Sequence, residues 1–585
     1  MANRPFDSRV QNLVYTLEVG IGANVLKTLL YGLFMILLAV LYVATQYSGF
    51  KEARAMDQAQ VARHFARTNR LNTSFVRPAS LWLLGQNGKL MVETDAGPRP
   101  NFHQHPDLMH PPAYPLVLGS AFKLFRTSFS LPTSHKYAPE QWVIIPINLL
   151  FAFLSGLFLY LSGRLLFDHR TALTAATVFL LSNSVWHHAI LGTEISLLVF
   201  LSALSLWSLL MALRAARREG ADPNPAGAGF WTPLLIGAVC LGGLLLTRYA
   251  AWPMLPGFVL VLWLGCGRKG WLPAGAVLLV AAGMFAPWIL RNLAVSGAPF
   301  GLAVYSILGD PQDVFLRSLA LDMSEFDLRR MVQARFVQTV PSLLNLSALG
   351  FSAGLSICLF FTTYFYRFQR PVTRILRWGV LLSSALFALT AGVFGDDLIP
   401  VAQMFLPVVV LYAAAFFYIL LDRLQIGVRI VSMSVIGLYI LLQALPMLFT
   451  IMPPRPWSYP PYMARDIGLV SSPFQPGELM VSDMPWATAW YGEVTSLYLP
   501  LDLEDFFRVN DSIHPVHGLY FTTLSRDKRF HSDLTRGPYR SWRPIMDLSQ
   551  LPRGFPLTFG FPIRNGEQVM LADRNRWMVA PEPSR

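Results

Sequence analysis

The sequence predicts an α-helical polytopic membrane protein with about 11 transmembrane helices and a small C-terminal extracytoplasmic α/β domain. Of its 585 residues, 54% are hydrophobic and only 14% are charged, whereas a soluble domain carries roughly 25% charged residues. Apolar runs close to the ~20 residues that a membrane helix needs recur along the chain. They stop near residue 451, and the remaining tail alternates short apolar and polar runs.

Eleven apolar runs are interpreted as spans. They lie at 25–47, 141–166, 171–190, 194–213, 232–248, 250–266, 271–290, 342–365, 375–394, 398–421 and 428–450. A twelfth run, Ala113 to Phe125, is shorter than a span and contains Lys123. We expect it to form a helix that lies on the outer surface of the membrane.

The short basic loops decide this interpretation. If 113–125 does not cross, the five loops at 164–170, 214–218, 268–269, 367–374 and 423–429 all fall on the side of the N-terminus. Cytoplasmic loops carry an excess of Lys and Arg. We therefore expect a multi-pass protein of the inner (plasma) membrane, with a cytoplasmic N-terminus and an extracytoplasmic C-terminal domain.

The expected organisation is a transmembrane domain at 1–451, with extracytoplasmic loops at 48–140 and 291–341, and a C-terminal domain at 452–585. Alternation of strand-like and helix-like runs in the tail predicts its α/β character. The strand-like runs are Glu478–Ser482, Thr495–Leu499 and Gly518–Thr523; the helix-like runs are Pro485–Tyr491 and Leu503–Val509.

The net charge of +13 does not indicate nucleic-acid binding. The Lys and Arg residues lie mainly in short loops and in the tail, without a basic helix face, which fits membrane topology and contact with anionic lipid. All three cysteines lie in or beside apolar spans. A disulfide framework is therefore not expected.

Asp57 follows the first span in Met-Asp-Gln-Ala-Gln-Val-Ala-Arg. A carboxylate near the membrane surface can act as a general base toward an acceptor hydroxyl or amine. It can also be a solvated acid that stabilises a helix start, and as an exposed loop acid it would contribute little to stability. Glu194, in Gly-Thr-Glu-Ile-Ser, is either a first-turn acid or a second acid in the same cavity.

A cluster of metal-ligand residue types lies at 103–110. His103, His105 and Asp107 are candidate ligands of a divalent metal, the one cofactor that these residues suggest. They can equally be exposed or substrate-contacting side chains. Arg248 and Arg291 lie at expected outer helix ends, where a guanidinium can bind phosphate through two parallel hydrogen bonds. Snorkelling to lipid head groups is the alternative.

These segments together resemble the polytopic glycosyltransferases of the type-C fold. The chain is most similar to the bacterial group that includes the lipid A aminoarabinose transferase and relatives of the protein O-mannosyltransferases. Met-Asp-Gln-Ala-Gln-Val-Ala resembles Asp-Glu-x-x-x-Ala of the family, and His-Pro-Pro-Ala-Tyr-Pro-Leu at 110–116 resembles Lys/His-Pro-Pro-x-Tyr-Pro. Gly-Thr-Glu-Ile-Ser, Thr-Arg-Tyr-Ala-Ala-Trp-Pro and the run 287–300 match further segments in order, over about 25–420.

The resemblance implies a sugar donor linked to a polyprenyl phosphate and an acceptor lipid, glycan or protein, with transfer on the outer face that inverts the anomeric carbon. Asp57 would be the catalytic base and Glu194 an accessory acid. Arg248 and Arg291 would bind donor phosphate. Substrate contacts would come from His110, Tyr114 and Asn292. Gln58 and Met109 depart from family acids, which puts metal dependence and the aminoarabinose substrate in question.

Two other classes compete with this interpretation. A transporter or flippase for a lipid-linked or anionic substrate also has many spans, but it predicts charged residues within the spans and inverted repeats. The spans here are nearly free of charge, and no internal repeat is found. A non-catalytic membrane scaffold that presents the tail domain would be insensitive to loss of Asp57.

Overall fold

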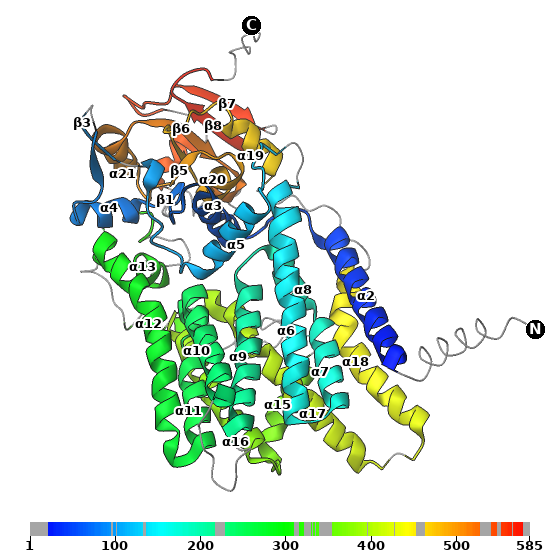
Figure 1. Cartoon of the computed structure of the whole chain (residues 1–585). Coiled ribbons are helices and arrows are strands. Elements are labelled where there is room, and N and C mark those ends of the chain that lie inside the picture. The colour runs from blue at the N-terminus through cyan, green and yellow to red at the C-terminus, as the bar shows by residue number, and fades with distance from the viewer. Residues whose placement is uncertain are drawn as a thin grey trace, which may run out of the picture.

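The computed structural model has a bundle of long helices with a mixed α/β body at one end (Figure 1). It describes residues 21–94, 97–100, 102–132, 136–216, 228–308, 315–320, 329, 332–333, 335–337, 354–394, 396–425, 427–451, 463–526, 540–546, 551–563 and 566–576.

Within the described residues, nine helices are long and apolar enough to cross a membrane, and each coincides with a predicted span. They are α2 (Ile21–Gln46), Glu140–Leu166 ending in α6 (Ile145–Leu166), α9 (Ile195–Ala216), α10 (Ala228–Thr247), Tyr249–Lys269 around α11 (Met254–Cys266), α12 (Trp271–Ser296), α16 (Pro371–Phe394), Leu398–Arg423 ending in α17 (Leu406–Arg423), and α18 (Arg429–Ile451).

The other two predicted spans differ. The span at 171–190 is broken at residues 181–182 into α7 (His169–Leu180) and α8 (Asn183–Leu191). At the break, the indole N–H of Trp186 donates to the Leu180 carbonyl at 2.5 Å, so a carbonyl freed by the interruption keeps a partner in apolar surroundings. Of the span at 342–365, the described part forms α15 (Leu355–Thr362) and a 3₁₀ turn; residues 342–353 lie outside the described residues.

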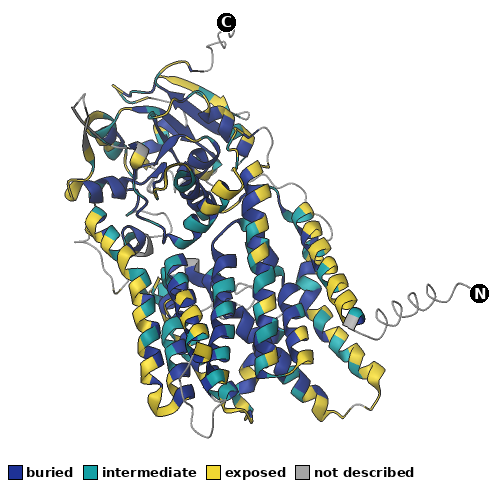
Figure 2. Ribbon diagram, in the orientation of Figure 1, coloured by how far each residue is buried: buried dark blue, intermediate teal, exposed yellow. Residues whose placement is uncertain are grey.

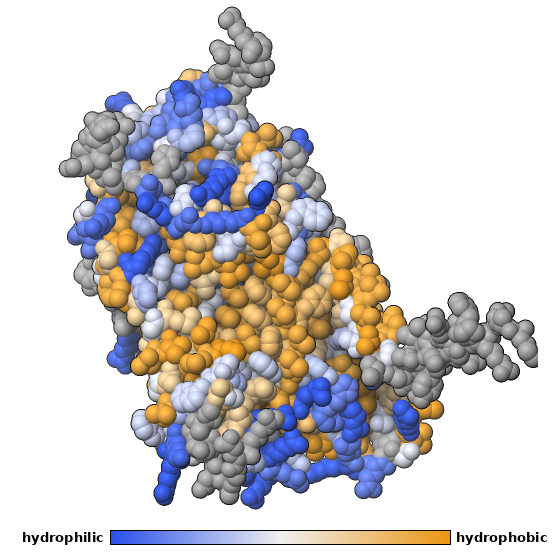
Figure 3. Space-filling model, viewed as in Figure 1, coloured by the Kyte–Doolittle hydropathy of each residue, from blue (hydrophilic) through white to orange (hydrophobic). Residues whose placement is uncertain are grey.

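Large apolar side chains cover the outside of the bundle. Leu29 on α2, Leu279 on α12 and Phe449 on α18 are 64%, 75% and 74% exposed. Figure 2 shows exposed residues along the outer faces of these helices, and Figure 3 shows a hydrophobic band between hydrophilic ends. A continuous apolar band around the bundle is favourable in contact with lipid and unfavourable in contact with water. The chain is therefore a multi-pass membrane protein.

The body at the end of the bundle is built on a six-stranded sheet of order β1-β5-β4-β6-β8-β7. The four strands β1 (Phe75–Val76), β5 (Thr495–Tyr498), β4 (Leu479–Ser482) and β6 (Val516–Phe521) are parallel to one another. Strand β8 (Gln568–Ala572) pairs antiparallel with β6, and β7 (Phe559–Ile563) pairs antiparallel with β8. The three strands predicted in the tail are confirmed as β4, β5 and β6. Strand β1 comes from the first loop, so tail residues alone do not complete the sheet.

Helices cover this sheet and separate it from the bundle. The two helices predicted in the tail are confirmed as α20 (Pro485–Tyr491) and α21 (Leu503–Arg508), and α19 (Ala464–Ser471) packs against α20. From the first loop come α3 (Ala53–Thr68), α4 (Pro78–Gln86) and α5 (Ala113–Leu124), with a hairpin of β2 (Met91–Thr94) and β3 (Gly97–Pro100). The short apolar run at 113–125 is thus a helix packed on α3 outside the bundle (Figure 1).

Buried polar contacts fix the body to the bundle. The Glu140 carboxylate at the start of the second span accepts hydrogen bonds from the Tyr47 hydroxyl at 2.6 Å and the Trp490 indole at 2.8 Å. The Arg63 guanidinium on α3 donates to the carbonyls of Ala489 and Trp490 at 2.6 and 2.8 Å. Because all these groups are buried and paired, the first loop and the tail form one unit.

Candidate active site

Helix α3 carries Asp57, the expected catalytic base, in a fully buried position. All residues from 55 to 63 are buried, because α5 covers one side of the helix and α20 another. The helix ends at Asn69 in the left-handed conformation, with φ of 59°. Asp57 is 3% exposed. The expectation that it is an exposed loop acid is therefore wrong.

Two chain segments bring charged groups to Asp57. The N–H of Thr73 donates to the His105 carbonyl at 2.8 Å, and the N–H of Asp107 donates to the Leu71 carbonyl at 3.1 Å. Residues 71–77 and 105–110 therefore run side by side, and each delivers a side chain to the same carboxylate.

The first of these side chains is Arg77, which lies just before Pro78 at the start of α4. Its guanidinium is 2.5 Å from Asp57 Oδ2 and stacks over the Phe75 ring at 3.8 Å from the centroid. The other carboxylate oxygen of Asp57 accepts a hydrogen bond from the Gln60 amide at 3.1 Å. Gln60 in turn holds the N–H of Ser74 at 2.9 Å, which fixes the amide in place.

The second side chain is His110. Its Nε2 is 3.4 Å from Asp57 Oδ2 and its Nδ1 is 3.3 Å from Asp107 Oδ2, so the imidazole bridges two carboxylates. Burial of Asp107 opposes its ionisation, but His110, the N–H of Met109 and Arg77 outweigh this effect and lower the pKa of Asp107 to about 2. Asp107 is therefore an anion. We call the buried group of Asp57, Arg77, His110 and Asp107 the Asp57 cluster.

The predicted metal ligands take other roles. The His105 ring lies 2.8 Å from the Ser80 hydroxyl, and burial lowers the pKa of His105 to about 4. The side chain of His103 lies outside the described part of the chain. Among the described side chains, no group of three His, Cys, Asp or Glu residues has a geometry that holds a metal. The two described members of the predicted set, His105 and Asp107, face Ser80 and His110, so these two side chains do not fit a metal ion.

Glu194 lies in a second cluster at the start of α9, fully buried. Its Oε1 is 2.9 Å from Arg54 Nε and 2.5 Å from Arg248 Nη1. Burial opposes ionisation of Glu194, but Arg54 and Arg248 prevail and lower its pKa to about 2. Arg248, a predicted phosphate ligand, is thus paired with the predicted accessory acid. Arg54 lies one turn before Asp57 on α3, so this helix connects the two clusters.

The remaining predicted residues brace these clusters. Arg291 on α12 donates to the Asp107 carbonyl at 2.6 Å and to Asn292 Oδ1 at 2.9 Å. The Asn292 amide donates to the Pro299 carbonyl at 3.2 Å. The Tyr114 hydroxyl donates to the Gly192 carbonyl at 2.8 Å, which ties α5 to the turn before Glu194. Arg291 therefore joins the Asp57 cluster, whereas Tyr114 and Asn292 position backbone.

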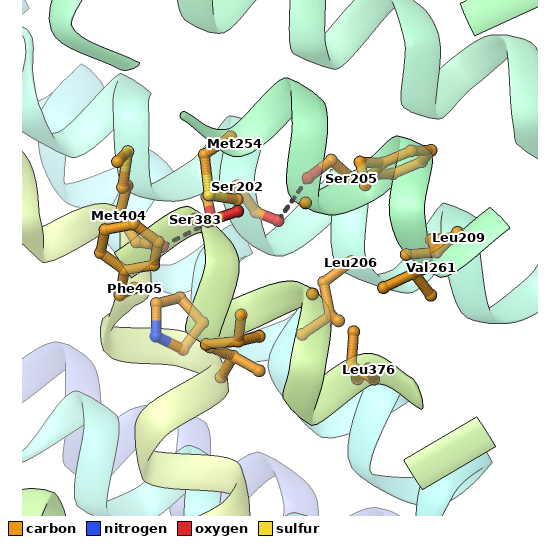
Figure 4. Close-up of a pocket in the computed structure, with 16 residues that line it drawn as sticks. Ser202, Ser205, Leu206, Leu209, Met254, Val261, Leu376, Ser383, Met404 and Phe405 are labelled. Carbon is orange, nitrogen blue, oxygen red and sulfur yellow. Dashed lines mark hydrogen bonds between the residues drawn. The ribbon is translucent and has the colours of Figure 1, made fainter. Parts of the chain in front are cut away.

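A cavity inside the bundle has a different character. It has a volume of about 50 Å³ and lies between α9, α11 and α16 (Figure 4). The hydroxyl of Ser202 donates to the Met404 carbonyl at 2.6 Å, and that of Ser205 donates to the Ser202 carbonyl at 2.8 Å. Ser202 and Ser205 are thus satisfied by backbone, and the volume is far below that of a sugar site. We interpret it as a packing gap.

No protein-family model and no curated protein sequence matches the chain. Solved structures do. ArnT from Cupriavidus metallidurans in the apo state superposes with a TM-score of 0.56 at 12% identity, covering 94% of this chain and 98% of that one. The form bound to undecaprenyl phosphate gives 0.54 at 12% identity, with 93% and 98% covered. The Archaeoglobus fulgidus oligosaccharyltransferase in complex with Zn and sulfate gives 0.53 at 13% identity, with 87% and 69% covered.

The chain has the type-C glycosyltransferase fold. The match to ArnT covers nearly all of both chains, so the type-C fold here includes the sheet body as well as the bundle. Sequence reasoning missed three groups of the site: Arg54, Arg77 and Gln60. Arg54 and Gln60 each lie three residues from Asp57, and helical spacing is the signal that would have found them. Arg77 carries no such signal, because only the folded loop brings it near.

Proposed function

We propose that this protein is a membrane glycosyltransferase that moves a sugar from a polyprenyl-phosphate donor to an acceptor lipid, glycan or protein. The observation that carries the proposal is a buried carboxylate, Asp57, held by Arg77 and His110 beneath the outer body of a type-C fold. That ArnT has been crystallised with undecaprenyl phosphate supports this donor class.

In this proposal Asp57 is the general base. Its Oδ1 accepts one described hydrogen bond, from Gln60, and a carboxylate oxygen has two lone pairs. The second lone pair would take the proton of the acceptor as the acceptor oxygen or nitrogen attacks the anomeric carbon. The bond from that carbon to the phosphate oxygen breaks at the same time, its electron pair stays on the phosphate, and the configuration inverts.

The cations of the two clusters would stabilise the leaving phosphate. The clusters contain one more arginine than carboxylate, so they retain positive charge before donor binds: the arginines are 54, 77, 248 and 291, and the carboxylates are those of Asp57, Asp107 and Glu194. The Arg54 side chain is 31% exposed, so an incoming phosphate could contact this guanidinium first. Glu194 would hold Arg54 and Arg248 as a pair, and not act as an acid.

We place the reaction on the outer face of the membrane. The end of the bundle opposite the sheet body carries the basic loops, including Arg214, Arg268, Arg370 and Arg423, and such loops favour the cytoplasm. The sheet body and both clusters would then be extracytoplasmic, where nucleotide sugars are not the donor.

The test is sugar transfer by the purified full-length protein in liposomes, with a labelled polyprenyl-phosphate sugar or the matching nucleotide sugar as donor. We expect labelled acceptor product from the lipid-linked donor only. Equal turnover with the nucleotide sugar would rule out the donor class, and product formation that is unchanged by Asp57→Asn would rule out the assigned base.

A further inference from the structure

A cavity lined in part by two arginines lies at the far end of the bundle from Asp57. It has a volume of about 370 Å³, and its walls come from the last turns of α6 and α9 and the first turn of α16. The lining includes Leu166 and Leu213 on the apolar side and the guanidinium-bearing Arg214 and Arg370 on the polar side. The volume is within the range of small-ligand sites, about 300–1,000 Å³.

The chain segment that forms one wall is firmly held. Arg377 is buried and donates to the carbonyls of Thr363 and Tyr366, the latter at 2.9 Å. The ring of Phe368 packs at 6.1 Å from Phe167 and 5.8 Å from Tyr412, between centroids. Arg370 itself donates to the carbonyl of Leu166, the last residue of α6, at 2.7 Å. The residues that form this wall of the cavity are therefore held in place by hydrogen bonds and aromatic packing.

The described residues that line this cavity do not compensate its charge. None of its lining residues is acidic. Arg214 has no hydrogen bond or ion pair to the part of the chain that the structure describes, and both arginines are exposed. Asp168, an acid at the same end, is instead engaged by Arg170 at 3.4 Å. Two guanidinium groups beside an apolar wall match a ligand with a phosphate and a hydrocarbon part.

We propose that this cavity binds the phosphate headgroup of an anionic phospholipid. The leucines would contact the glycerol and first acyl carbons, and Arg214 and Arg370 would share the phosphate oxygens. Basic pockets between membrane helices on the cytoplasmic side are suited to such headgroups. This site is separate from the proposed reaction, and its test does not depend on transfer activity.

The experiment is native mass spectrometry of the full-length protein after exchange into mixed micelles of neutral detergent with equal amounts of phosphatidylglycerol and phosphatidylcholine. We expect preferential retention of phosphatidylglycerol. Arg214→Ala should weaken retention about fivefold, and Arg214→Ala with Arg370→Ala about 25-fold, since each basic side chain at the membrane surface contributes about that factor. Arg268→Ala with Arg429→Ala, two exposed basic residues at the same end, is the matched control and should retain lipid normally.

Arg214→Ala is the cleaner variant, because Arg370 also supports the Leu166 carbonyl. Equal retention of both lipids by the unmodified protein would overturn the proposal, as would equal losses in Arg214→Ala and the control pair. A separate arm adds millimolar inorganic phosphate. Displacement of phosphatidylglycerol by phosphate alone would mean that the cavity recognises free phosphate, and it would overturn the assignment to lipid.

Discussion

The guanidinium of Arg77 lies 2.5 Å from the carboxylate of Asp57, and the two side chains are 7% and 4% exposed. The ion pair joins α3 to the segment that contributes β1 to the six-stranded sheet. The placement of the proposed base therefore depends on both the membrane domain and the tail.

Replacement of Arg77 tests this dependence. Arg77→Met leaves Asp57 buried without its counter-ion, and removal of one partner of a buried pair costs about 3–5 kcal/mol. We expect a marked drop in melting temperature in detergent. Asp57→Asn with Arg77→Met removes both charges and should recover part of the loss. If Arg77→Met were as stable as the unmodified protein, the ion pair between Arg77 and Asp57 would not be formed in solution.

Asp57→Asn tests the base. Turnover should fall about 10²-fold or more, the usual contribution of a positioned base, while binding of the polyprenyl-phosphate donor is retained. Because Arg77 is left unpaired, we also expect a lower melting temperature, which an exposed acid would not give. Single-turnover transfer measured at saturating donor separates the two effects, and the Arg77→Met variant supplies the matched stability control.

Arg248→Ala should act on donor binding. The loss of a charged hydrogen-bond donor costs roughly 1.5–3 kcal/mol, so we expect KM for the lipid-linked donor to rise about tenfold or more with a smaller change in kcat. Arg248→Lys keeps the charge but loses the planar fork and should rescue only partly. A change confined to kcat would assign Arg248 to the chemical step.

His105 predicts a pH dependence of stability. Burial lowers its pKa from 6.5 to about 4, so between these values the unfolded chain takes up a proton that the folded chain does not. The free energy of unfolding that His105 contributes is fully present above about pH 6.5. It decreases as the pH falls toward 4, by about 3 kcal/mol at most. Thermal unfolding across this window should show the loss, and His105→Gln should make the profile flatter. An identical profile for the variant would contradict the assignment.

The orientation is tested by labelling single introduced cysteines in intact cells, in a background with the native cysteines replaced. Labels at Arg268 and Arg370 should be protected from an impermeant reagent, and labels at Gly477 should react. Reaction at Arg370 would place the basic end outside and the Asp57 cluster in the cytoplasm, against the proposed donor.

Sequence patterns predicted what depends on local periodicity. Apolar length placed nine spans within the described residues, and the tail strands and helices followed from the alternation of strand-like and helix-like runs. The break between α7 and α8 was missed because the two polar residues there, Ser182 and Asn183, hardly lower the mean hydropathy of the run at 171–190.

The site was predicted only in part for the same reason. Asp57, His110 and Asp107 were chosen by residue type, and the structure brings them together. Their burial and the Arg77 contact arise from packing between distant segments, which a single sequence does not encode locally. Conversely, His105 has the residue type of a ligand but faces Ser80, because the direction of a loop side chain follows from the fold.

The pairing of Phe75 with Ser496 in β1 and β5 sets an order of assembly during biosynthesis. More than 400 residues separate the two strands, so at roughly 5–20 residues per second the ribosome needs some tens of seconds to make the second after the first. During this time Arg77 and Asp57 lie on a nascent loop that is not yet covered by the tail residues of α20 and β5. A chain that ends before β5 lacks the strand that pairs with β1, so we expect it to insert its membrane helices and to lack the proposed transfer activity.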